Sequence, residues 1–237
     1  MAATISYETL SPFAGGFPTQ SSYSRNGLGI GTAAGNRTVL IASFATSQTD
    51  RTLSSITLGG NTPDLVETVI GTPNGAGFAL ILHLHRIDVA SGTTADLAVT
   101  YSDTVLDYGC FIAAAYGIAS STFDTTTGGT NSPTLDLNTS AGGIAIGFTA
   151  MFDTGLTNPT LSWSGLTERA DDNVNYTTTA AGWADLETAS ASTPLAVSVT
   201  HPTASGSDVS YSAISASFAE AAAAGTILPG MMQQYYG

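Results

Sequence analysis

The stretch from Leu161 to Glu187 reads LSWSGLTERADDNVNYTTTAAGWADLE and holds both tryptophans of the chain. Its apolar residues lie on either side of a polar run, which predicts two antiparallel strands facing each other across a polar connection. We expect Trp163 and Trp183 to lie in the core of a β-sandwich or at its rim. Glu168 and Arg169 are expected to form a structural ion pair or hydrogen-bond anchor that fixes a strand end.

The rest of the chain repeats short apolar segments separated by turn residues. Arg37 to Ser47 (RTVLIASFATS) and Tyr108 to Ile118 are apolar on both alternating faces, as is typical of central strands covered on both sides. Leu53 to Leu58 and Asp64 to Ile70 flank the turn cluster Gly59-Gly60-Asn61, which predicts a hairpin. No convincing helical period occurs before the C-terminus. The sequence therefore predicts an all-β fold, an antiparallel β-sandwich of jelly-roll-like type.

The composition is even except near the two ends. Residues 1–36 hold a short strand and a segment rich in Gly, Ser and Pro (Ser11 to Gly35), which predicts a loop or extended arm. Residues 37–220 contain no linker between two self-sufficient cores, so we expect one sandwich domain. Residues 221–237 are expected to form a short C-terminal docking tail.

The tail carries four large apolar side chains on a segment too short to bury them alone. They are Met231, Met232, Tyr235 and Tyr236. Flexible Met and amphipathic Tyr side chains are typical of docking segments. We expect contact with a neighbouring subunit, and a disordered terminus is the alternative.

Charge narrows the range of partners. The chain has 5 Arg and no Lys against 18 carboxylates, a net charge of −13, and only 10% of its residues are charged. Binding to phosphate backbones needs clustered cations, so nucleic acid and anionic membranes are poor candidates. No apolar run approaches the roughly 20 residues of a membrane helix, and the N-terminus lacks the features of a secretory signal. We expect a protein made in a cytoplasm.

The sequence offers few candidates for metal binding. His83 and His85 share one face of a predicted strand and could hold a metal if further ligands converged, but the only other imidazole is His201. Partly buried or cross-strand-paired histidines are the favoured interpretation, so no metal site is predicted. Asp171 and Asp172 could bind calcium through their oxygens, although the spacing of a calcium-binding loop is absent and the question stays open.

The strongest enzymatic alternative is glycoside hydrolysis. Glu168, Asp185 and Glu187 lie in or beside the stretch with the two tryptophans, where paired carboxylates could act on a stacked sugar. Carboxylates at strand ends are, however, usually just solvated. The chain has no nucleophile elbow, P-loop or dinucleotide fingerprint, and its single Cys110 sits in an apolar run typical of a buried small residue. We predict a protein that is not an enzyme and needs no cofactor.

Five segments carry a family resemblance through their order and spacing. They are GNRTVLIASF (Gly35 to Phe44), SSITLGGNTPDLV (Ser54 to Val66), AGGIAIGF (Ala141 to Phe148), WSGLTERAD (Trp163 to Asp171) and AGWADLE (Ala181 to Glu187). Together they resemble a group of β-sandwich proteins encoded in the structural regions of tailed bacteriophages and prophages. The resemblance extends from about Gly35 to Glu220 and includes neither the N-terminal arm nor the tail.

The resemblance implies a virion component without catalytic residues. We expect an exterior capsid-decoration, head-fibre or tail-fibre subunit that contacts other virion proteins through its termini and loops. A homo-oligomer is expected, with a trimer favoured. The alternative is a carbohydrate-binding module or host-receptor adhesin with exposed aromatic residues. The residues taken as the structural signature are Arg37, Trp163, Glu168, Arg169 and Trp183.

Overall fold

The computed structural model describes residues 2–12, 20–71, 78–129, 133–153, 160–174, 179–202 and 209–222. In these segments the chain forms antiparallel strands and no helix, which confirms the predicted all-β class and sandwich architecture. The same segments accordingly contain no helix long and apolar enough to cross a membrane.

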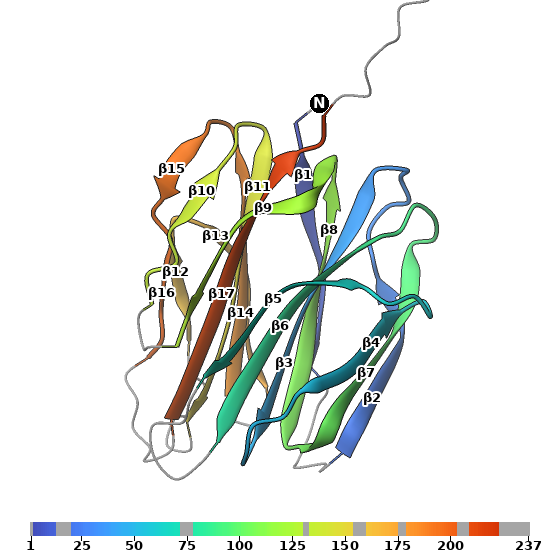
Figure 1. The fold of residues 1–237 in the computed structure, drawn as a ribbon, viewed down its shortest axis with the longest axis vertical. Coiled ribbons are helices and arrows are strands. Elements are labelled where there is room, and N and C mark those ends of the chain that lie inside the picture. Colours follow the sequence, from blue (N-terminus) through green and yellow to red (C-terminus); the bar gives the residue numbers. More distant parts are fainter. Residues whose placement is uncertain are drawn as a thin grey trace, which may run out of the picture.

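The first half of the described chain forms two sheets. Its strands are β1 (Thr4–Pro12), β2 (Gln20–Gly29), β3 (Arg37–Ser47), β4 (Leu53–Leu58), β5 (Asp64–Gly71), β6 (Ala79–Asp88), β7 (Thr94–Val105) and β8 (Asp107–Tyr116). A five-stranded sheet has the order β1-β8-β3-β6-β5, and a three-stranded sheet has the order β2-β7-β4. Figure 1 shows the two sheets packed as successive layers.

The second half of the described chain repeats this arrangement. Its strands are β9 (Ile118–Gly128), β10 (Leu137–Thr139), β11 (Gly143–Asp153), β12 (Ser162–Ser164), β13 (Thr167–Val174), β14 (Thr179–Thr188), β15 (Ser192–Leu195), β16 (Ser198–Thr200) and β17 (Val209–Glu220). The five-stranded sheet has the order β13-β14-β11-β17-β9, and two small sheets pair β10 with β15 and β12 with β16.

The two halves have equivalent connections. When β15 and β16 are counted as one interrupted strand, each half has eight strands. Numbered from one to eight within its own half, each five-stranded sheet has its strands in the order first, eighth, third, sixth, fifth. The chain thus folds as two similarly connected sandwiches, a duplication that the sequence did not reveal.

The main core lies between the two five-stranded sheets, at the centre of four layers (Figure 1). Phe44 and Phe111 from the first sheet meet Phe148 and Trp183 from the second, with ring centroids 5.4 to 6.5 Å apart. The outer face of each sheet is covered by the small sheets of its own half. Because each five-stranded sheet is covered on both faces, its middle strand, β3 or β11, is buried at every position.

Two of the expected strand arrangements are wrong. Gln20–Gly29, expected to be part of a loop or arm, forms β2 and pairs with β7, because backbone pairing and the buried ring of Tyr23 compensate for its few apolar side chains. The expected hairpin of Leu53–Leu58 and Asp64–Ile70 does not form either: β4 pairs with β7, and β5 pairs with β6. Gly59 and Gly60 have positive φ angles of 57° and 80°, and the turn they form sends the chain from one sheet to the other.

The stretch from Leu161 to Glu187 folds largely as predicted. β13 and β14 pair antiparallel, with Thr167 opposite Asp185 and Val174 opposite Thr179. The short strand β12 precedes them and belongs to a covering sheet. This segment therefore contributes to two layers of the second sandwich.

Candidate functional site

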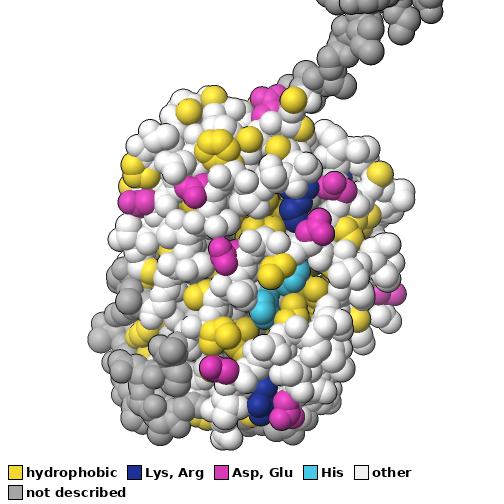
Figure 2. Space-filling view, viewed as in Figure 1, with side chains coloured by type: hydrophobic (Ala, Val, Ile, Leu, Met, Phe, Trp, Pro, Cys, Tyr) yellow, Lys and Arg dark blue, Asp and Glu magenta, His cyan; other side chains and the backbone are white. Residues whose placement is uncertain are grey.

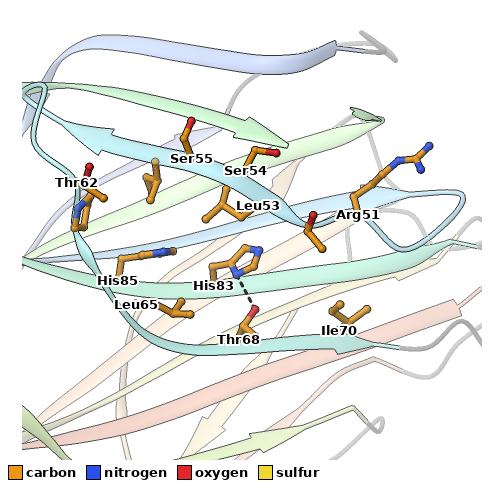
Figure 3. Close-up of a pocket in the computed structure, with 13 residues that line it drawn as sticks. Arg51, Leu53, Ser54, Ser55, Thr62, Leu65, Thr68, Ile70, His83 and His85 are labelled. Atoms are coloured by element: carbon orange, nitrogen blue, oxygen red, sulfur yellow. Dashed lines mark hydrogen bonds between the residues drawn. The ribbon is translucent and has the colours of Figure 1, made fainter. Parts of the chain in front are cut away.

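A pocket of about 350 Å³ opens where β4 and β5 diverge. Its floor is formed by His83 and His85 of β6, and its walls are apolar side chains and hydroxyl groups from β4, β5 and the segments beside them (Figure 3). The lining residues are Arg51, Thr52, Leu53, Ser54, Ser55, Ile56, Thr62, Pro63, Leu65, Thr68, Ile70, His83 and His85. The pocket exists because the chain changes sheets at the Gly59-Gly60 turn and leaves part of β6 uncovered.

His83 is held in one tautomer by its neighbour on β5. Its Nδ1 lies 2.6 Å from Oγ1 of Thr68, and that hydroxyl donates to the carbonyl of Leu82 at 3.0 Å. A threonine hydroxyl has a single proton, so both hydrogen bonds can form together only in the tautomer in which Nδ1 of His83 donates to Thr68. Nε2 of His83 therefore carries a lone pair, and this buried atom has no hydrogen-bond partner among the described residues.

His85 lies beside His83, with the two ring centroids 5.9 Å apart. Its Nδ1 is also buried without a hydrogen-bond partner in the described part of the chain. Burial lowers the pKa of both histidines to about 4, and for His85 the neighbouring His83 lowers it further. Both imidazoles are therefore neutral at neutral pH, and both are available as bases or ligands.

The charged groups around the pocket are few. Arg51 stands at one end, where its guanidinium pairs with Asp103 at 3.2 Å and donates to the carbonyl of Thr104 at 3.3 Å. The lining contains no carboxylate. The pocket is thus an apolar chamber with a hydroxyl rim and two neutral imidazoles on its floor.

Exposed apolar side chains border the pocket. Within the described segments three large apolar side chains are exposed: Leu65, Ile70 and Phe123, at 57%, 39% and 51%. Leu65 and Ile70 belong to β5 and line the pocket itself. Figure 2 shows the histidines in a hollow with hydrophobic side chains around it. Apolar groups gathered around a concavity are typical of binding surfaces.

Arg37, one of the predicted signature residues, is a buried anchor for loops. Its guanidinium donates to the carbonyls of Val89 at 2.7 Å, Gly31 at 2.6 Å and Ser91 at 2.8 Å. Only 1% of the residue is exposed. Arg37 thus ties together the segments that contain Gly31, Val89 and Ser91.

Arg169 binds a different carboxylate from the one expected. Its Nε lies 2.8 Å from Oδ1 of Asp185, and Nε1 of Trp183 donates to Oδ2 of the same carboxylate at 3.1 Å. Burial of Asp185 raises the pKa of its carboxyl against the lowering effect of these two donors. Glu168 is exposed beside this cluster, so the anchor at the strand joins Arg169 to Asp185 rather than to Glu168.

The tryptophans do not form a binding platform together. Trp183 is fully buried in the main core. Trp163 is half-buried and lies over Gly147 of β11, where an added Cβ would come within 2.5 Å of its ring. Trp163 and Trp183 therefore belong to the rim and the core of the sandwich, as predicted from the sequence.

The other carboxylates considered from the sequence have structural partners. Oε1 of Glu187 accepts from the backbone nitrogen of Ile5 at 3.2 Å, and Oδ2 of Asp171 accepts from that of Leu161 at 2.9 Å. Asp171 and Asp172 lie in β13 rather than in a loop. Cys110 is buried, as expected. The predicted partner-binding residues Met231, Met232, Tyr235 and Tyr236 lie outside the described residues.

The chain matches no protein-family model, no curated protein and no solved structure. In the described segments, no three side chains of His, Cys, Asp or Glu gather as a group that could hold a metal ion. Among the pocket residues that the sequence did not single out are Leu65, Thr68 and Ile70. They reach the histidines through the pairing of β5 with β6, which the sequence pattern did not indicate.

Proposed function

We propose that this protein is a non-enzymatic structural protein of a bacteriophage virion, an exterior capsid-decoration, head-fibre or tail-fibre subunit. The basis is the resemblance of its sequence segments to phage structural proteins, together with the architecture of the chain. A large buried core fixes the two sandwiches to each other. Such a body suits a particle surface, which has to stay folded outside the cell.

The strand order supports this proposal. In each half the first strand pairs with the eighth, and the third lies between the eighth and the sixth. Jelly rolls have this order, and they are common in viral capsid proteins and in lectins. The fifth strand departs from the usual pattern, because it joins the sixth in the larger sheet.

The observation that carries the proposed mode of action is an apolar edge. The exposed Leu65 and Ile70 lie on β5, and the exposed Phe123 lies on β9. Both are edge strands of the five-stranded sheets, and Glu67 of β5 accepts a hydrogen bond from Thr125 of β9 at 3.0 Å. Unprotected edges with apolar side chains are unusual on monomers. We assign this edge to contact with further copies of the chain, in a closed oligomer such as a trimer.

Carbohydrate binding is the weaker alternative, because Trp183 is fully buried and Trp163 is half-buried, so the two tryptophans present no exposed platform. The net charge of −13 suits an exterior position, since it keeps the protein away from packaged DNA and from like-charged cell surfaces.

The oligomeric state and the location on the particle test the proposal. We expect purified protein to form an oligomer in multi-angle light scattering, and antibodies against it to label intact phage particles in electron microscopy. The triple variant Leu65→Ser, Ile70→Ser, Phe123→Ser should be monomeric with an unchanged circular dichroism spectrum. Thr167→Ser, at an exposed position of the opposite edge strand β13, is the matched control. A monomer that binds neither capsids nor tails would refute the proposal.

A further inference from the structure

We propose that the pocket between β4 and β5 is a binding site for a divalent late transition-metal ion, with His83 and His85 as its protein ligands. Imidazole nitrogen is a favoured ligand of Zn²⁺, Cu²⁺ and Ni²⁺. The two side chains are 7% and 3% exposed, and each has a buried nitrogen without a hydrogen-bond partner in the described part of the chain. Both rings project from β6 into the pocket (Figure 3).

The surroundings of His83 are those of a preorganised metal ligand. Histidines that bind metals usually donate their other ring N–H to a fixed acceptor, which sets the tautomer and the orientation of the ring. Thr68 provides this acceptor at 2.6 Å and is itself oriented by its bond to the carbonyl of Leu82. This arrangement leaves the lone pair on Nε2 of His83, and His83 forms part of the pocket floor.

The spacing of the two rings suits a shared ion. Residues separated by one position on a strand project from the same face, about 6.6 Å apart along the backbone. Zn²⁺ binds imidazole nitrogens at about 2.0–2.1 Å, so two imidazoles on one ion have ring centroids about 5 to 6 Å apart. The observed separation of 5.9 Å falls in this range.

The rest of the pocket determines which ions it would take. The lining offers no carboxylate, so hard cations such as Ca²⁺ and Mg²⁺ find few of the oxygen ligands they need. Arg51 is paired with Asp103, which offsets its charge. With two protein nitrogens, the remaining positions of the ion are left to water or to a small external ligand. The Irving–Williams order of affinities for divalent metal ions then predicts that the site binds Cu²⁺ more tightly than Zn²⁺.

His201 serves as an internal reference. It is buried, and its Nε2 already shares a hydrogen bond of 2.8 Å with Oγ1 of Thr149. Both bonds of the Thr149 hydroxyl, to Nε2 of His201 and to the carbonyl of Ser212 at 2.9 Å, form together when Nε2 is the donor, so Nε2 is then occupied and the lone pair of the ring is on Nδ1. His201 does not line the pocket, so a metal ion bound there should affect His83 and His85 and leave His201 unchanged.

The test is a titration of the full-length protein with Zn²⁺ and with Cu²⁺. Calorimetry should show one ion per chain, and ¹⁵N-edited spectra with Zn²⁺ should show shifts of the His83 and His85 ring nitrogens but not of His201. His83→Phe and His85→Phe should each weaken binding at least tenfold. Thr68→Val, which leaves both ligands in place, should weaken it about 10- to 100-fold. Ser24→Ala, at an exposed position of β2 outside the pocket, is the control and should bind as the parent does.

Three results would overturn the proposal. The first is an absence of binding at millimolar metal. The second is equal binding by the parent and by the double variant His83→Phe, His85→Phe, which would place the ion elsewhere. The third is loss of binding in one single histidine variant only, which would exclude a shared ion. Circular dichroism and thermal melting without metal establish that each variant is folded.

Discussion

Phe44 and Phe148 contact each other at the centre of the molecule, with ring centroids 6.3 Å apart. Each lies on the third strand of its half, which is the middle strand of a five-stranded sheet. The edge strands of the two five-stranded sheets contact each other reciprocally. The fifth strand of the first half, β5, lies near the first strand of the second half, β9, and the first strand, β1, lies near the fifth, β13. This reciprocal contact of the edges is what a two-fold relation between the two sandwiches would produce.

The first prediction concerns this central contact. Phe148→Ala should lower the free energy of unfolding by about 3–5 kcal/mol, because it removes a ring that packs on Phe44 and Phe111 and leaves a cavity. Chemical denaturation monitored by circular dichroism measures the change. Phe123→Ala is the matched control, since Phe123 is 51% exposed and its loss should cost less than about 1 kcal/mol. Similar costs for both variants would mean that the two sheets are not held together by this core.

The second prediction concerns the loop anchor. Arg37→Lys keeps the charge but cannot reach three carbonyls in the geometry of a guanidinium. We expect a loss of about 2–4 kcal/mol in unfolding free energy, since the carbonyls of Val89, Gly31 and Ser91 lose the donors of a buried guanidinium. Faster hydrogen exchange in residues 89–92 should accompany it. Arg51→Lys, at a partly exposed ion pair, should cost less than about 1 kcal/mol, and the reverse ranking would contradict the assignment.

The third prediction concerns Gly147. An added Cβ there would come within 2.5 Å of the Trp163 ring, so Gly147→Ala should destabilise the protein by about 1–3 kcal/mol and change the tryptophan fluorescence. Gly35→Ala is the control, because no atom lies within 4 Å of the position of its added Cβ. Unchanged fluorescence in the Gly147 variant would mean that Trp163 does not rest on β11.

The strands that the sequence predicts well are those with a strong side-chain pattern. β3 and β8 are apolar on both faces because each lies between two layers, and such runs are visible in one sequence. β2 was missed since its Gly, Ser and Asn residues provide little pattern, and its place depends on backbone pairing with β7. The hairpin prediction failed because turn residues specify a reversal of the chain and not the partner of each strand.

The pocket was predictable only in part. The sequence placed His83 and His85 on one face of a strand, and the structure agrees. The sequence did not predict the contact of Thr68 with His83, because this contact depends on the pairing of β5 with β6. The duplication was also hidden, since equivalent strands differ in their side chains, as where Leu82 and Trp183 lie opposite Phe44 and Phe148. Strand order is a property of the fold that dissimilar sequences can share.

The last prediction concerns acid stability. Burial lowers the pKa of His83 and of His85 to about 4 in the folded chain, whereas unfolded histidines titrate near their ordinary value of 6.5. Between these values the unfolded chain binds protons that the folded chain does not, so the free energy of unfolding falls as the pH decreases from 6.5 to 4. Each unit of pKa difference corresponds to about 1.4 kcal/mol, so the expected loss is a few kcal/mol. The slope due to the two histidines should fade over about one pH unit above 6.5, because unfolded histidines are half protonated at their pKa.

Urea denaturation from pH 4 to pH 7.5 measures this slope, and the double variant His83→Phe, His85→Phe isolates the part due to the pocket. Its profile should be flatter than that of the parent between pH 4 and 6.5. Asp185 acts in the opposite direction, because its raised pKa makes the folded chain bind a proton more readily than the unfolded chain. This contribution is common to both proteins and cancels in their difference. Parallel profiles over this range would show that the two imidazoles are solvated rather than buried.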